Sequence, residues 1–162
     1  MHPRLVICDE PVSALDVSVQ AQIINLLGDL KRELDLALIF IAHDLSVVKH
    51  ISDRIMVFYL GRVMEYAAAR DLVYAPRHPY TRALVSAVPI PDPAIERGRG
   101  VPVLKGDPPS PLTPPSGCVF RTRCPVARLS CAGERPAMRD FGNHHFAACP
   151  YGEPAEEGSL AS

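Results

Sequence analysis

An apolar run that ends in two carboxylates constrains this chain more than any other feature. Leu5 to Cys8 are four apolar residues, and Asp9 and Glu10 follow them directly. A short apolar run of this kind is typical of a buried strand. In open α/β sheets, ligands bind at the edge formed by the carboxyl ends of the strands. The sequence therefore predicts a strand that carries two carboxylates to a binding edge.

The chemistry available to these carboxylates suits a phosphate site. An Asp at the end of a strand can hold Mg²⁺ through water, and an adjacent Glu can orient or deprotonate an attacking water molecule. An isolated pattern of this type is more often just a strand followed by an acidic turn. The residues that follow therefore decide between the two interpretations.

Apolar strands and amphipathic helices alternate as far as Val88, which favours an α/β fold. Ser18 is the expected cap of a helix that runs to about Leu34, with apolar residues at spacings of three and four. Ala37 to Ala42 are continuously apolar, which predicts a second strand buried on both faces. The other expected elements are a helix at 46–51, a hairpin of strands at 54–59 and 62–66, and helices at 69–74 and 79–88.

The composition of the sequence changes after Val88. Nine of the 29 residues from Pro89 to Gly117 are proline, so this stretch is expected to form an extended arm. The 32 residues from Cys118 to Cys149 contain four of the five cysteines and show little hydrophobic periodicity. A piece of this size buries too little apolar surface to fold alone, so we expect it to need a cross-link such as a bound metal. Residues 153–162 are expected to be disordered.

Composition excludes several functions. The formal net charge is −1, so no broad attraction to nucleic acid or anionic lipid is expected. The longest apolar run, 36–42, has seven residues, whereas a membrane-spanning helix needs about 20. The N-terminus has no signal-peptide pattern, so the chain is expected in the cytosol. In that reducing compartment, five cysteines favour metal binding over disulfides.

Two further motifs accompany the carboxylates. Residues 11–16, Pro-Val-Ser-Ala-Leu-Asp, follow Glu10 directly, and His43-Asp44 closes the second apolar run. With these motifs the chain resembles the nucleotide-binding domains of ABC-type ATPases, whose Walker B strand, catalytic Glu, D-loop and switch His occur in this order. The resemblance implies the C-terminal part of a P-loop-type α/β domain that uses ATP and Mg²⁺.

The resemblance also implies roles for individual residues. Asp9 matches the Asp that coordinates the Mg²⁺ of Mg-ATP, and Glu10 matches the Glu that activates water. Ser13 and Asp16 lie in the D-loop, which reaches across the dimer interface in the family. His43 matches the switch His that contacts the γ-phosphate.

Longer stretches look like the ATPase subunits of dipeptide and oligopeptide importers, and more like the second of the two paired subunits. They are residues 11–22, 39–54, 78–84 and 114–118. Nickel importers share this subfamily. The resemblance implies a paired ATPase subunit, two membrane permeases and, indirectly, an extracytoplasmic peptide-binding protein as partners, at the cytoplasmic face of the plasma membrane. It divides the chain into an ATPase part (1–88), a C-terminal extension (89–152) and a tail (153–162).

Three motifs of intact ABC ATPases are missing. No Gly is followed by Lys, so there is no Walker A loop, and no Gly-Gly pair exists for a signature motif. No candidate Q-loop precedes Asp9. The chain is therefore expected to be a truncated product that is inactive alone. Two alternatives stay open: a non-catalytic regulatory or assembly fragment, and an iron–sulfur redox module.

Four cysteines form a candidate metal site in the extension, separated by five, six and seventeen residues: Cys118, Cys124, Cys131 and Cys149. Four thiolates suit Zn²⁺ or a [4Fe–4S] cluster, but structural zinc sites favour pairs two to four residues apart, and none occurs here. Family members carry an iron–sulfur cluster at this pattern, so the resemblance favours [4Fe–4S], with zinc as the alternative. His145 is a possible replacement ligand, although a solvated loop is the simpler expectation. Three arginines close in sequence to these cysteines could offset a cluster's negative charge: Arg121, Arg123 and Arg128. Cys8 lies outside this set and is expected to be a small core residue.

Overall fold

Two compact units make up the computed structural model of the chain, which describes residues 3–89, 104 and 106–152. The boundary between them falls between Asp53 and Arg54. Residues 54–88 therefore share a unit with the cysteine segment. The domain boundaries that the sequence indicates, at 88/89 and 152/153, stay predictions. Most of the proposed arm and the whole tail from 153 lie outside the described residues, and residues 106–117 contain no helix or strand.

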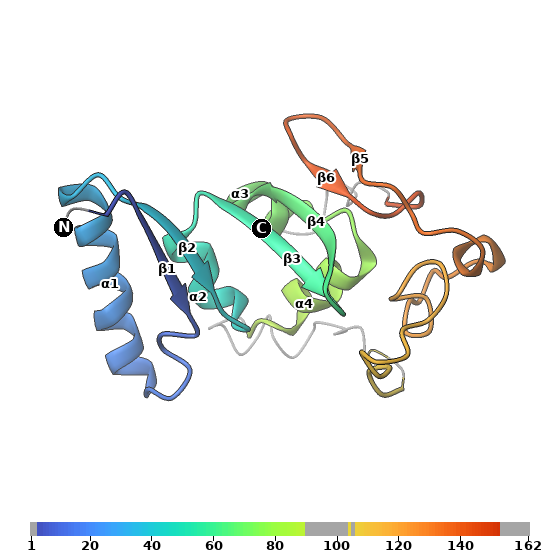
Figure 1. Ribbon diagram of the computed structural model, residues 1–162, viewed down its shortest axis with the longest axis horizontal. Coiled ribbons are helices and arrows are strands. Elements are labelled where there is room, and N and C mark those ends of the chain that lie inside the picture. Colours follow the sequence, from blue (N-terminus) through green and yellow to red (C-terminus); the bar gives the residue numbers. More distant parts are fainter. Residues whose placement is uncertain (1–2, 90–103, 105, 153–162) are drawn as a thin grey trace, which may run out of the picture. The chain divides into compact units, whose positions relative to one another are not determined.

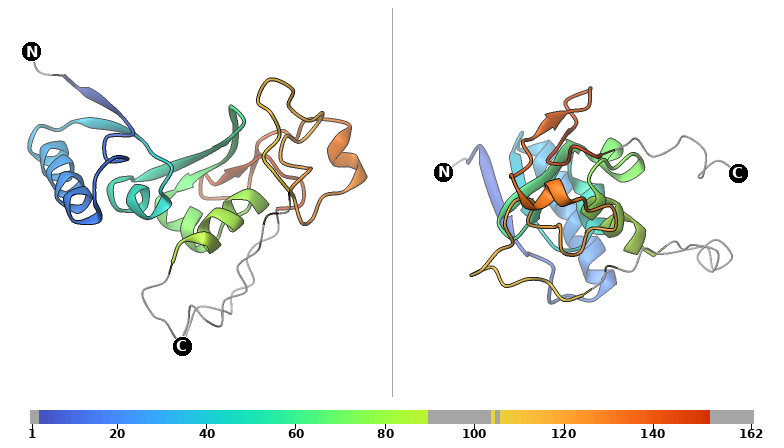
Figure 2. Two further views of the ribbon diagram at one scale, coloured as in Figure 1. Left: turned by 90° about the horizontal axis from the view of Figure 1, so that it is seen from below. Right: turned by 90° about the vertical axis from the view of Figure 1, so that its right-hand side faces the viewer.

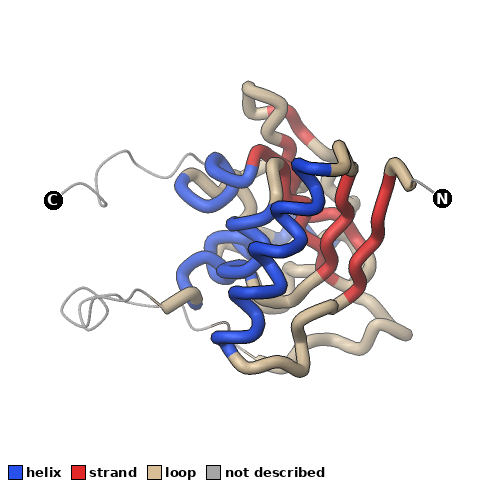
Figure 3. The backbone as a smooth tube through the Cα atoms, turned by 90° about the vertical axis from the view of Figure 1, so that its left-hand side faces the viewer, coloured by secondary structure: helices blue, strands red, loops and turns tan. Residues whose placement is uncertain are grey.

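The first unit is built from two strand–helix pairs (Figure 1). Its elements are β1 (Leu5–Asp9), α1 (Val17–Glu33), β2 (Ala37–Ile41) and α2 (Leu45–Ile51). The strands are parallel, and their register pairs Leu5 with Ala37 and Asp9 with Ile41. Their carboxyl ends consequently meet at one edge of the sheet. Figure 3 shows α1 running along one side of this strand pair.

Helix α1 is capped by Asp16. One carboxylate oxygen of Asp16 accepts hydrogen bonds from the backbone N–H groups of Ser18 and Val19, each at 3.0 Å. The prediction that Ser18 is the cap is therefore wrong, because the chain already turns into the helix at Val17. A side chain at the preceding residue satisfies the first free amides of the helix, which is the function of an N-cap.

One face of the β1–β2 sheet is open. The side chains of Leu5, Ile7, Ile39 and Ile41 are 47–62% exposed, while the residues between them are half-buried. The prediction of a strand buried on both faces is thus wrong for β2 as the structure describes it. Parallel sheets are normally covered by helices on both faces. Nothing in the described part of the chain covers this one.

The second unit begins with a hairpin. Strands β3 (Arg54–Tyr59) and β4 (Arg62–Ala68) are antiparallel, as predicted. Leu60 and Gly61 connect them with φ values of 47° and 70°, the backbone of a two-residue type I′ turn. The remaining elements of the unit are the helices α3 (Ala69–Tyr74) and α4 (Pro79–Ala87), the 3₁₀ turn η1 (Leu129–Ala132), and the short strands β5 (Arg139–Asp140) and β6 (Phe146–Ala147).

The cysteine segment adds strands to this hairpin. The order of the sheet is β3-β4-β6-β5, and Figure 2 shows β5 and β6 beside β3 and β4. Phe120 is fully buried, and its ring lies 5.3 Å from that of Tyr59 and 5.1 Å from that of Tyr80. The segment therefore shares a core with the hairpin and α4. The segment thus buries apolar residues against strands distant in sequence and not by itself, while the expected need for a metal cross-link stays a prediction.

Among the residues that the structure describes, no helix combines the length and apolar character needed to cross a membrane.

Candidate functional site

Glu10 follows β1 with an unusual backbone. Its φ of 46° lies in the left-handed region, which non-glycine residues rarely adopt. Two neighbours hold it there: its N–H donates to the carbonyl of Ile41 at 3.0 Å, and its own carbonyl accepts from the Ser13 hydroxyl at 3.1 Å. Such strain persists where the surroundings over-determine it, and it concentrates at functional sites.

Glu10 and His43 come together at the edge where the parallel strands end. The distance between Oε1 of Glu10 and Nδ1 of His43 is 3.4 Å, although 33 residues separate them. Their side chains are 52% and 74% exposed, so the contact contributes little to stability. The fold places a carboxylate and an imidazole side by side in solvent, where both can reach a ligand.

A small pocket surrounds this pair. Gln20 and Asp44 belong to it, although neither was predicted as a site residue. The amide of Gln20 donates to the carbonyl of Val12 at 3.0 Å, which ties α1 to the loop after β1. The N-cap of α2 is Asp44, and the hydroxyl and backbone amide of Ser46 hold the pKa of this carboxyl below its usual value. The pocket is lined by Glu10, Val12, Ser13, Gln20, Ala42, His43, Asp44 and Val47.

Two of the predicted residues lie outside this pocket. Asp9 ends β1 in register with Ile41, is exposed like Leu5 and Ile7, and does not line the pocket. Asp16 caps α1. The structure thus gathers Glu10, Ser13 and His43, and places Asp9 one residue away. The roles predicted for these residues stay predictions.

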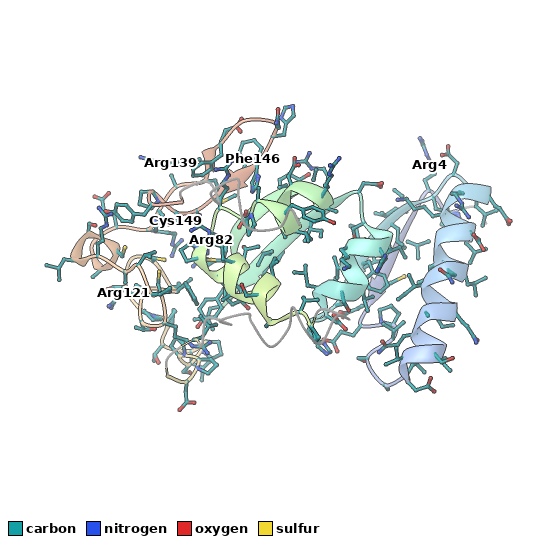
Figure 4. All side chains as sticks on the ribbon, turned by 180° about the vertical axis from the view of Figure 1, so that it is seen from behind. Arg4, Arg82, Arg121, Arg139, Phe146 and Cys149 are labelled. Atoms are coloured by element: carbon teal, nitrogen blue, oxygen red, sulfur yellow. The ribbon has the colours of Figure 1, made fainter. Side chains whose placement is uncertain are left out.

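The four cysteines of the second unit line one pocket, together with residues of α4 and the loops around them. Cys118 and Cys149 are buried, whereas Cys124 and Cys131 are half-buried. All four are free thiols. Figure 4 shows Cys149, Arg82 and Arg121 in the same part of this unit. The structure therefore brings together four thiols that span 32 residues of sequence.

Burial raises the pKa of three of these thiols, and that of Cys124 reaches about 11. Repulsion among the thiolates adds to this effect, and it acts between every pair of the four. Arg121 beside Cys118 and Arg82 beside Cys149 act in the opposite direction. A crowded set of thiols next to guanidinium groups suits a group that binds several thiolates at once.

A single metal ion fits less well. In the described ranges, no three His, Cys, Asp or Glu side chains converge closely enough to hold one ion. Zinc requires its ligands within about 2.3 Å of one point, whereas a multi-iron cluster binds thiolates that lie further apart. The metal site that the sequence indicates at these cysteines, with [4Fe–4S] or zinc, stays a prediction.

His145 is neither a metal ligand nor a solvated loop residue. It is 4% exposed, and its Nε2 lies 2.6 Å from Oε1 of Glu65, which is fully buried. Glu65 also accepts hydrogen bonds from the backbone N–H groups of Arg77 and His78, at 2.7 and 2.9 Å. His145 is therefore the buried partner of the Glu65 carboxylate, which lies 80 residues earlier and would be costly to bury without such a partner. Both the metal-ligand and the solvated-loop interpretations of His145 are wrong.

His78 is a further residue that sequence reasoning passed over. Its Nδ1 accepts the backbone N–H of Tyr80 at 3.0 Å and so caps α4, whose first residue is Pro79. Burial, with a smaller contribution from Arg82, lowers the pKa of His78 to about 4. The available signal was the proline itself, which is common at the first position of a helix and points to the preceding residue as the cap.

Comparisons with known proteins give concordant matches. Residues 64–131 match the family described as "Oligopeptide/dipeptide transporter, C-terminal region". The oligopeptide transport ATP-binding protein OppF of Haemophilus influenzae is 58% identical over 149 residues, which are 92% of this chain and 45% of that protein. OppF of Salmonella typhimurium is 59% identical over 144 residues, 89% of this chain and 43% of that protein.

A putative peptide import ATP-binding protein of Brucella ovis is 56% identical over 149 residues, 92% of this chain and 46% of that protein. The chain thus spans less than half the length of these relatives. The resemblance drawn from the sequence motifs is confirmed: the chain is similar, over about nine-tenths of its length, to the C-terminal part of oligopeptide transport ATP-binding proteins.

Proposed function

We propose that this chain, which corresponds to the C-terminal part of oligopeptide-type ABC importer ATPases, carries half of the hydrolytic machinery of a subunit that energises uptake of di- or oligopeptides. The approach of Glu10 to His43 at 3.4 Å, beyond the ends of two parallel strands, carries the proposal. The names of the relatives support the transport role.

In the proposed mechanism, each residue acts on bound Mg-ATP by position and charge. Glu10 orients or deprotonates the attacking water, and His43 contacts the γ-phosphate. Asp9, exposed at the end of β1, holds the Mg²⁺ ion through water. Ser13 and Asp16 belong to the loop that faces the paired ATPase subunit. The described residues include no phosphate-binding loop, so we propose that the chain does not hydrolyse ATP by itself.

The proposed setting follows from the relatives' role in peptide transport. Two membrane permease subunits hold the ATPase pair at the cytoplasmic face of the membrane, and an extracytoplasmic binding protein delivers the peptide. Coupling of ATP hydrolysis to transport then requires contact with the permeases.

The test is to join this chain to the matching N-terminal part of Haemophilus influenzae OppF and to measure ATP turnover. Glu10→Gln and His43→Ala should each lower turnover by about 10²–10⁴-fold. Glu33→Gln, an exposed carboxylate of α1, is the matched control and should leave turnover unchanged. Near-normal turnover in both site variants contradicts the assignment. A joined protein that binds Mg-ATP but never hydrolyses it favours the regulatory alternative.

We also propose that the four cysteines hold a [4Fe–4S] cluster, with Zn²⁺ as the alternative. Support comes from the single pocket that all four line, from the mutual repulsion of every thiolate pair, and from Arg121 at the pocket wall. When bound, the cluster would cross-link the 118–131 loops to the end of β6. Arg121 would offset part of its negative charge.

Metal analysis of anaerobically purified chain tests this proposal. We expect about four iron and four sulfide per chain. Replacing any one of the four cysteines by Ser should abolish the brown colour, whereas Cys8→Ser, in β1 of the other unit, should preserve it. One equivalent of zinc without iron assigns the site to zinc, and protein with neither metal contradicts both.

A further inference from the structure

The loop before Cys118 approaches the last residues of η1 more closely than any side chain at Gly117 allows. A Cβ atom on Gly117 would lie 2.3 Å from the carbonyl oxygen of Cys131 and 2.9 Å from the carbonyl carbon of Ala132. Both atoms belong to the backbone and cannot rotate away. The φ of Gly117 is +62°, which adds backbone strain for any other residue.

This approach allows hydrogen bonds between residues 116–118 and the end of η1. The N–H of Cys118 donates to the carbonyl of Cys131 at 2.8 Å, and the hydroxyl of Ser116 donates to the carbonyl of Ala132 at 3.0 Å. The guanidinium of Arg121 donates to the carbonyl of Ser116 at 2.9 Å from Nε. The first two bonds join residues 116–118 to 131–132, and we call these two bonds the clasp; the third lies within residues 116–121. The clasp joins the backbones of two of the four cysteines directly.

We infer that Gly117 is the positioning residue of the four-thiol site: its missing side chain lets the clasp form, and the clasp sets the separation of the Cys118 and Cys131 thiols. The inference rests on the proposed metal site for the identity of the ligand. It does not rest on that proposal for the geometry, because the clasp consists of protein contacts alone.

The rest of the site has independent support, which makes the role of Gly117 separable from folding. Phe120 anchors the Cys118 loop in the core of the unit. Cys149 follows β6, whose pairing with β4 continues in the hydrogen bond from the N–H of Ala148 to the carbonyl of Met64 at 2.8 Å. Loss of the clasp should therefore displace Cys131, which is half-buried, and leave the core assembled.

The first experiment compares Gly117→Ala with Gly106→Ala in the complete chain. Gly106 has a φ of +70°, so Ala brings similar backbone strain there, but nothing lies within 4 Å of the added Cβ. Both variants are reconstituted anaerobically with ferrous iron and sulfide and then mixed with an iron chelator. We expect Gly117→Ala to lose iron about 10–100-fold faster than the wild type, as is typical when a residue that supports metal ligands is changed. Gly106→Ala should match the wild type.

A second measurement needs no metal. With Cys8, Cys124 and Cys149 changed to Ser, only Cys118 and Cys131 remain, and mild oxidation should join them because their backbones already share a hydrogen bond. Gly117→Ala in this background should lower the disulfide yield at least fivefold, which corresponds to roughly 1 kcal/mol in the free energy of disulfide formation. Gly106→Ala should leave the yield unchanged.

The outcomes separate the two proposals. Equal disulfide yields in Gly117→Ala and the wild type overturn the inference, whatever the metal content. A wild-type chain that binds no iron but loses the disulfide in Gly117→Ala supports the positioning role and overturns the cluster. If Gly117→Ala does not fold, Ser116→Ala removes the bond to Ala132 without the clash. A wild-type disulfide yield in Ser116→Ala, with equally slow iron loss, then overturns the inference.

Discussion

The buried His78 should make the second unit sensitive to mild acid. Its pKa falls from 6.5 to about 4 on folding, because the ring is buried and, to a smaller extent, because the Arg82 guanidinium repels the protonated ring. The unfolded chain therefore binds a proton between pH 6.5 and pH 4 that the folded chain does not. Stability is fully present above pH 6.5 and is lost as the pH falls toward 4. The free energy of unfolding should decrease by about 2 kcal/mol between pH 7 and pH 5, and by about 3 kcal/mol in total.

Urea unfolding followed by tyrosine fluorescence measures this loss selectively, because all five tyrosines lie in the second unit and the chain has no tryptophan. His78→Asn keeps a side-chain acceptor for the cap of α4 but does not titrate, so the decrease between pH 7 and pH 5 should vanish. His144→Asn is the matched control: His144 is exposed, and Asn tolerates its φ of 55°. An undiminished pH dependence in His78→Asn would refute the reasoning.

Three further predictions concern other features. Glu65→Ala leaves His145 and two backbone N–H groups buried without their acceptor, so we expect a loss of about 3–5 kcal/mol in urea unfolding, whereas Glu134→Ala, on the surface, should change it by less than about 0.5 kcal/mol. The open apolar face of β1 and β2 should cause self-association of the isolated chain. Light scattering should show less of it when Ile7 and Ile39 are both Thr, and an unchanged mass would contradict this explanation. The isolated chain should show no ATP turnover above background, and hydrolysis that disappears in Glu10→Gln would contradict the proposed inactivity.

Most elements of the described fold were predictable because their signals are local. The apolar spacing of α1 and the Leu60-Gly61 turn each act within a few residues of the structure that they specify. The cap of α1 shows the limit of such signals. Asp16 and Ser18 are both good N-cap residues, and only the point at which the chain enters the helix decides that Asp16 takes the role.

The approach of Glu10 to His43 was also predictable, since the ends of neighbouring parallel strands share an edge. The divergence of Asp9 from Glu10 follows from a rule that is just as simple. Side chains alternate along a strand, so two adjacent carboxylates at its end cannot both face the same side unless the backbone turns between them. Here β1 ends at Asp9, and Glu10, which follows with a positive φ, lines the pocket, whereas Asp9 does not.

The placement of the cysteine segment was missed because polar contacts between distant residues determine it. Hydrophobic periodicity is weak from Cys118 to Cys149, and by that criterion the segment has no core of its own. In the structure, Glu65 on β4 is fully buried, and it binds the amides before α4 as well as the ring of His145. A fully buried carboxylate is costly unless each partner is in place. The same contacts that satisfy Glu65 therefore hold β6 beside β4 and bring Cys149 to the other thiols, so the four-thiol pocket can form before any metal binds.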